Sequence, residues 1–147
     1  MSRRLRAAAV LAGGLALAGC AAEVADLNVA DGGFADGSYS GVSAPDDQGG
    51  YGEVEVTIAG DDVTAVEFVL RQADGTTKGE DYGKTNGQVI SEEVYARAQA
   101  GIAAAPVYAA RFVETDDLDA VDVVTGASLT HGQFLEAVAD ALGSARA

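Results

Sequence analysis

Alternation of apolar and polar residues predicts three β-strands in the first half of the chain. Val54, Val56 and Ile58 are separated by polar residues, which is the period of a strand with one buried face. We expect a shorter strand in DGSYSGVSA, residues 36–44, and a more apolar strand in residues 63–70. The turn-forming stretches PDDQGGYG and AGDD separate these segments, so they are predicted to pair as an antiparallel meander.

Helical periodicity follows a polar, glycine-rich stretch at residues 73–87, which we interpret as a loop. Ser91, with two glutamates directly after it, is typical of a helix start, because acidic groups stabilise the positive end of a helix. The apolar residues of segment 94–102 share one face of this helix. Pro106 fits the first position of a second helix, which we expect to end near Val113.

The last third of the chain predicts one further strand and one further helix. The short β-branched run VDVV, residues 121–124, favours a strand, and the apolar residues of 134–142 fall on one face of a C-terminal helix. The predicted fold class is therefore α+β: a small antiparallel sheet, made of the meander plus the late strand, packs with about three helices. We expect this single domain to span residues 36–144.

The N-terminus has the composition of an export signal. Three arginines precede the apolar run 7–17, which is too short to span a bilayer as a helix. The run leads into LAGC, residues 17–20, which resembles the lipobox of bacterial lipoproteins, where cleavage exposes an acylated cysteine. Residues 1–19 are thus predicted to be a lipoprotein signal peptide, Cys20 the lipidated residue, and residues 20–35 a flexible tether to the domain.

Charge and cysteine content narrow the possible partners. The full chain has a net charge of −14, and loss of residues 1–19 removes three basic residues and no acidic one, which leaves about −17. Nucleic acid and anionic lipid surfaces are unfavourable partners for so acidic a protein. Cys20 is the single cysteine, which excludes an internal disulfide and a thiolate metal cluster. The paired aspartates lack the ligand spacing of an EF-hand, so no metal site is expected.

Two patterns that resemble catalytic motifs are incomplete. GEDYGKT, residues 79–85, has three residues between its glycines where a phosphate-binding P-loop needs four, and we interpret it as a polar loop. His131, the only histidine, lies three residues after Ser128, and a hydrolase needs converging side chains and an orienting acid. We therefore assign no catalytic residue and expect His131 to be solvated in the first turn of the last helix.

The stretch DVVTGAS, from Asp122 to Ser128, has two interpretations. Thr130 with Gln133 three residues later has the spacing of a capping box, so the stretch could be a plain helix start whose turn Gly126 permits. The order of Asp, two variable residues, Thr, Gly, Ala and a final hydroxyl residue also resembles the flavinylation motif of FMN-binding-domain proteins.

This resemblance implies a covalent cofactor. In that family a flavin transferase uses FAD to place FMN, through a phosphodiester bond, on the last hydroxyl of the motif. Carried over to this chain, Ser128 is the attachment residue, and the residues that the transferase recognises are Asp122, Thr125, Gly126 and Ala127. Family members more often have Thr at the attachment position, and Thr125 and Thr130 are the alternative hydroxyls.

The resemblance covers nearly the whole predicted domain, from Asp36 to Leu142, through DGSYSG, GGYGEVEVTI, VTAVEF and TGASLTHGQFLEAVADAL in this order. It implies an exported, lipid-anchored flavoprotein that carries electrons at the outer face of the cytoplasmic membrane, without substrate turnover of its own. Its partners are then a flavin transferase and membrane redox proteins. Candidate aromatic rings beside the flavin are Tyr39, Tyr51 and Tyr82, although core packing or anchoring of a loop is the more common role of a single tyrosine. The alternative is a surface lipoprotein of the same fold that receives no flavin and binds a ligand or another envelope protein.

Overall fold

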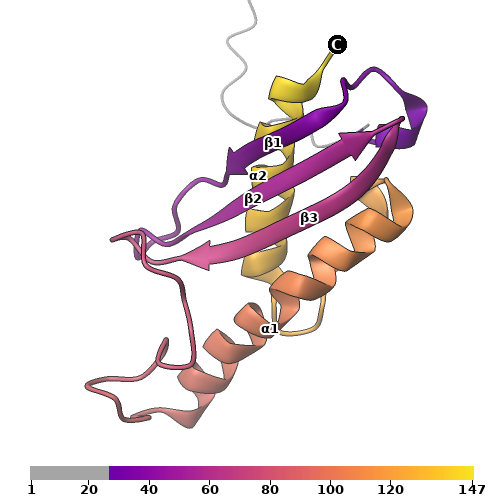
Figure 1. The fold of residues 1–147 in the computed structure, drawn as a ribbon. Coiled ribbons are helices and arrows are strands. Elements are labelled where there is room, and N and C mark those ends of the chain that lie inside the picture. The colour runs from indigo at the N-terminus through magenta and orange to yellow at the C-terminus, as the bar shows by residue number, and fades with distance from the viewer. Residues whose placement is uncertain (1–26) are drawn as a thin grey trace, which may run out of the picture.

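The computed structural model describes residues 27–147, so the predicted signal peptide and Cys20 lie outside the described residues. Three antiparallel strands form one sheet in the order β1-β2-β3, as the alternating pattern predicted (Figure 1). The strands are β1 (Gly37–Val42), β2 (Tyr51–Ala59) and β3 (Asp62–Arg71). The register places Tyr39 opposite Val56 and Val54 opposite Phe68. The predicted meander is confirmed.

Two long helices cover one face of this sheet, which makes a two-layer α+β domain (Figure 1). They are α1 (Glu92–Thr115), which packs along β3, and α2 (Ser128–Ala145), which crosses β1 and β2. There are also two single turns of 3-10 helix: η1 (Val29–Asp31) precedes β1, and η2 (Leu118–Ala120) lies between α1 and α2 in the chain. Neither α-helix in residues 27–147 combines the length and apolar character needed to cross a bilayer.

Aromatic side chains from three elements fill the centre between the layers. The Phe134 ring of α2 lies 5.0 Å from that of Phe68 on β3, 5.9 Å from Tyr108 and 6.2 Å from Phe112 on α1, measured between centroids. Gly41 of β1 lets α2 approach closely, because a Cβ atom there would overlap the carbonyl oxygen of Ala137. The sheet and α2 are thus in backbone contact at this glycine.

The segment predicted to hold two helices is one continuous helix. Pro106 lies inside α1, although proline removes a backbone hydrogen bond and disfavours a helix interior. The reason is one buried stripe that runs past the proline on the sheet side, while Pro106 itself is exposed. The stripe consists of Gly101, Ala104, Ala105, Tyr108, Ala109 and Phe112. Packing of this continuous face outweighs the local cost of the proline.

The predicted strand at residues 121–124 is absent from the sheet, and this prediction was wrong. Side chains bond to the backbone N–H and carbonyl groups that would pair with a neighbouring strand. The Val121 carbonyl contacts His131 Nε2, Arg111 donates to the carbonyl of Asp122, and the Val124 N–H donates to the Tyr108 hydroxyl. The β-branched run is therefore an extended connection held against α1 and α2.

Residues 27–35, which were predicted to belong to the tether, are packed on the domain. Leu27, Val29 and Phe34 are buried. The Val29 N–H donates to the carbonyl of Asp116 at the end of α1, and the Ala35 N–H donates to the carbonyl of Ala145 at the end of α2. The domain therefore includes this segment, because its apolar side chains complete the core.

Candidate functional site

A tight turn leads from the extended connection into α2. The Ala127 N–H donates to the Val124 carbonyl at 3.0 Å, and Gly126 has a φ of 81°, as expected at the third position of a type II turn. A Cβ at Gly126 would meet no atom within 4 Å. The glycine is therefore needed for its backbone conformation, and the space above it is open.

Ser128 is the first residue of α2, and its side chain is exposed. The first N–H groups of an α-helix have no intrahelical acceptor. No side chain within residues 27–147 caps α2, and its first turn carries no acidic residue. By contrast, Ser91 caps α1, and Glu92 and Glu93 lie in its first turn. The Ser128 hydroxyl thus lies at an uncompensated positive helix end, which favours an anion.

The capping-box interpretation of this helix start was wrong. Thr130 lies inside α2 and is buried, since its side chain packs against Gly101 of α1, where a Cβ would lie 2.7 Å from Thr130 Oγ1. Gln133 is also buried and donates to the carbonyl of Gly50. Both side chains therefore join α2 to its neighbours. Of the two alternative hydroxyls, Thr125 is exposed and Thr130 is not.

Three side chains hold the backbone of this stretch in place. The Tyr108 hydroxyl accepts from the Val124 N–H at 2.9 Å and donates to the Ala127 carbonyl at 3.1 Å. Arg111 donates to the Asp122 carbonyl at 2.9 Å. His131, which was expected to be solvated, is half-buried, lies 2.6 Å from the Val121 carbonyl through Nε2 and packs against the Tyr108 ring. We call these three residues the clamp.

The clamp binds only main-chain atoms of the stretch, so the motif side chains remain free. Asp122, Thr125, Gly126 and Ser128 are exposed, whereas Ala127 is buried at 3% exposure. Sequence reasoning missed the clamp, because its members lie on two helices whose packing the sequence does not reveal. The structure therefore places the five candidate site residues on one anchored segment, with four of them exposed and Ala127 buried in the core.

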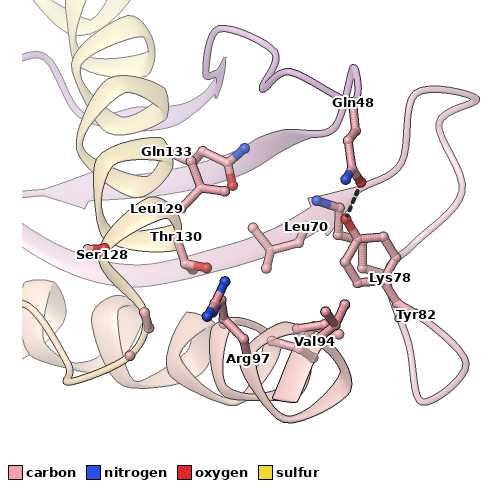
Figure 2. Close-up of a pocket in the computed structure, with 15 residues that line it drawn as sticks. Gln48, Leu70, Lys78, Tyr82, Val94, Arg97, Ser128, Leu129, Thr130 and Gln133 are labelled. Atoms are coloured by element: carbon pink, nitrogen blue, oxygen red, sulfur yellow. Dashed lines mark hydrogen bonds between the residues drawn. The ribbon is translucent and has the colours of Figure 1, made fainter. Parts of the chain in front are cut away.

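A cavity of about 400 Å³ opens beside Ser128, between α1, α2 and the loop after β3 (Figure 2). This volume lies in the range of small-molecule sites. Val94 and Leu129 line it and are 54% and 62% exposed. The other residues that line it include Leu70, Ile102, Arg97, Gln48, Lys78 and Tyr82. The arrangement offers apolar walls with a few polar groups.

Only one of the three candidate tyrosines lines this cavity. Tyr82 lines it, with its hydroxyl 3.4 Å from Gln48 Oε1. The hydroxyl of Tyr39 instead donates to the carbonyl of Ala35, which lies just before the first residue of β1. Tyr51, the first residue of β2, is not among the residues that line the cavity. The structure therefore favours Tyr82 as the aromatic contact of a ligand beside Ser128.

A buried lysine at the far side of the cavity was not foreseen from the sequence. Lys78 Nζ lies 3.4 Å from Asp46 Oδ2 and 4.5 Å from the centre of the Tyr82 ring. Burial acts to raise the pKa of Asp46, but the N–H groups of Gly50 and Gln48 and the Lys78 ammonium together lower it below its ordinary value. Asp46 is therefore a stable anion that orients Lys78.

A second cation, Arg97 of α1, lines the same cavity. Figure 2 shows the Arg97 side chain extending from α1 toward the start of α2, near Thr130. Its partner in α1 is Glu93, at 2.9 Å, and both side chains are largely exposed. An exposed ion pair of this kind is weak, so the guanidinium is free to bind another anion.

Comparisons with known proteins agree with this architecture. The family model described as the FMN-binding domain matches residues 49–143. A crystal structure of the CPE2226 protein from Clostridium perfringens is similar in fold, with a TM-score of 0.60 at 19% identity over 76% of this chain and 88% of that chain. Comparison with curated proteins gave no match.

Proposed function

Because this chain belongs to the FMN-binding domain family, it is a flavin-binding protein, and we propose that Ser128 carries its FMN through a phosphodiester bond. The observation that carries the proposal is the position of Ser128: an exposed hydroxyl at an uncapped helix start, on the edge of the cavity. An anchored turn with free side chains is also what a modifying enzyme needs in its substrate.

The bond changes are those of a phosphoryl transfer. The Ser128 oxygen forms a bond to the FMN phosphorus of FAD, the phosphoanhydride bond breaks, AMP leaves, and the hydroxyl proton passes to a base of the flavin transferase. Asp122 and Thr125, both exposed, supply side chains that the transferase can recognise. Gly126, with open space above it, allows the enzyme to approach the backbone.

The residues around Ser128 fit the two ends of FMN. A phosphodiester keeps one negative charge, which the first N–H groups of α2 and the Arg97 guanidinium can neutralise. The isoalloxazine is large and mostly apolar, and the cavity offers Leu70, Val94 and Leu129 as walls. Covalent attachment has a physical advantage outside the cytoplasm, because a dissociated flavin would be lost by diffusion.

We further propose that the protein is an electron carrier on the outer face of the cytoplasmic membrane. FMN supplies reversible electron transfer, and the protein supplies position and electrostatic surroundings. The export signal and the acylated Cys20 predicted from the sequence place the carrier at the membrane through lipid alone. The net charge of about −17 expected after loss of residues 1–19 favours membrane redox partners with basic docking faces.

The test is the intact mass of the full chain, exported in a bacterial host together with an active flavin transferase. We expect a gain of one FMN less one water that survives denaturation in the unaltered chain and in Ser128→Thr, and no gain in Ser128→Ala. Ser40→Ala removes an exposed hydroxyl from β1 and serves as the matched control, which we expect to be flavinylated. An unmodified chain beside a modified control substrate would refute the proposal and favour a ligand-binding surface lipoprotein.

A further inference from the structure

Lys78 is the only buried cationic side chain in residues 27–147. Its side chain is 5% exposed, in a chain that has few basic residues. Burial of an ammonium group costs free energy unless paired charges and hydrogen bonds compensate it. The buried ammonium of Lys78 therefore depends on the groups that surround it.

Within the described part of the chain, the compensation is incomplete. An ammonium group has three donors, and Lys78 Nζ makes one hydrogen bond, a long one of 3.4 Å to Asp46 Oδ2. The other oxygen of Asp46 accepts from the N–H groups of Gln48 and Gly50, at 2.9 and 2.8 Å. The Tyr82 ring covers the ammonium but accepts no conventional hydrogen bond. Donors of Lys78 are thus left for a ligand.

The position of these donors relative to Ser128 is specific. Lys78 and Ser128 both line the same cavity, and Figure 2 shows Lys78 with Gln48 and Tyr82 on the side opposite Ser128. Gly50 makes room for the ammonium, because a Cβ there would lie 2.6 Å from Lys78 Nζ. A ligand fixed at Ser128 that fills the cavity meets Lys78 at its other end.

We propose that Lys78 binds the pyrimidine edge of the isoalloxazine and stabilises the negative charge that this edge carries in reduced FMN. The inference rests on the proposed function, since it requires a flavin attached at Ser128. The pyrimidine edge is the part of the ring with carbonyl and imine acceptors, which suit an ammonium donor. Two electrons and one proton added to the neutral ring leave one negative charge there, and a nearby cation favours that state.

The experiment is an anaerobic redox titration of the flavinylated full chain, with dithionite as the electron source and the buffer as the proton source. Lys78→Met removes the charge and keeps the length of the side chain. Lys84→Met is the matched control, because it removes the same charge from a lysine paired with the exposed Asp81 and absent from the lining of this cavity. Intact mass confirms FMN in each variant before titration.

We expect the equilibrium constant for reduction to fall about tenfold in Lys78→Met, a midpoint shift of about −30 mV for a two-electron couple. Lys84→Met should leave the midpoint potential unchanged. Two further variants act on Lys78 without removing it. Asp46→Asn should raise the potential, because Lys78 loses its counter-charge, and Gly50→Ala should lower it, because the new methyl group displaces the ammonium.

The outcomes separate failure of the role proposed for Lys78 from failure of the proposed attachment of FMN. Equal shifts in Lys78→Met and Lys84→Met would show an effect of total charge and would overturn the role of Lys78. An unchanged potential in both Lys78→Met and Asp46→Asn, in chains that carry FMN, would overturn it as well. If Lys78→Met fails to fold, Asp46→Asn and Gly50→Ala give the same decision. A chain that never acquires FMN refutes the proposed function itself.

Discussion

The clamp provides the sharpest test of how the attachment site is built. Tyr108→Phe removes one hydroxyl and keeps the ring that packs against His131 and Phe134. Two hydrogen bonds are lost, one from the Val124 N–H and one to the Ala127 carbonyl. The Ala127 carbonyl keeps a partner, since it also accepts from the His131 N–H at 2.9 Å. The Val124 N–H, in a half-buried residue, is left without one.

These losses give the expected magnitude. An unsatisfied buried donor costs about 1–3 kcal/mol, and a hydrogen bond whose acceptor keeps another partner contributes little more. We therefore expect Tyr108→Phe to lower the free energy of unfolding by about 2 kcal/mol. A domain of this size loses about 4 °C in Tm for each kcal/mol, so Tm should fall by about 8 °C. Urea unfolding and a thermal scan of the exported chain measure both values.

The same substitution should slow FMN transfer. Without the hydroxyl, the turn from Val124 to Ala127 is no longer tied to α1, so Ser128 spends less time in the geometry that the transferase binds. The transfer rate is measured far below both Tm values, so that every chain is folded. Tyr39→Phe is the control, because its hydroxyl donates to carbonyls at an exposed site where water can replace it. A Tyr108→Phe protein with unchanged Tm and transfer rate would refute the clamp.

Three further predictions test other parts of the site and the fold. Gly126→Ala should cost about 1–2 kcal/mol in urea unfolding and slow FMN transfer, because alanine is strained at a φ of 81°. Gly41→Ala should cost about 1–3 kcal/mol, since the methyl group pushes α2 away from β1; unchanged unfolding would contradict the close approach. The Asp46 pKa is lowered in the folded state, so its stabilisation is present above its ordinary pKa and is lost as pH falls through the lower folded value. When the pH is lowered from about 5 to about 2, the free energy of unfolding should therefore fall less in Asp46→Asn than in the unaltered chain, as measured by urea unfolding at each pH.

The sheet could be predicted from the sequence because a strand with one buried face has a period of two. Val54, Val56 and Ile58 show that period, and the structure buries all three. The helix through Pro106 could not be predicted, because the proline is a local stop signal and its compensation is tertiary. Ala104 and Ala105, directly before the proline, stabilise the helix only because they are buried in the packed domain, and no local pattern reveals that burial.

The candidate site shows the same division. The turn at Gly126 and the hydroxyl of Ser128 could be recognised from local residue order, whereas the capping box at Thr130 placed the start of α2 too late. Lys78 could not be recognised in this way, since its burial depends on how the loop after β3 folds back over Asp46 and Gly50. The strand predicted at residues 121–124 was wrong for a related reason. Its backbone groups bond to side chains of α1 and α2, and not to a neighbouring strand.

The site combines a fixed main chain with free side chains, and this combination fits a protein that another enzyme modifies. A flexible stretch with the same residues would lose conformational entropy on binding the transferase, which weakens recognition. A stretch held through its own side chains would hide the groups to be recognised. Here the clamp residues, Tyr108, Arg111 and His131, hold the carbonyl and N–H groups, so Asp122 and Ser128 remain available. The turn is therefore held in one conformation by residues of the packed helices. Substitutions of Tyr108 or Arg111 in α1 should consequently alter the modification of Ser128 in α2.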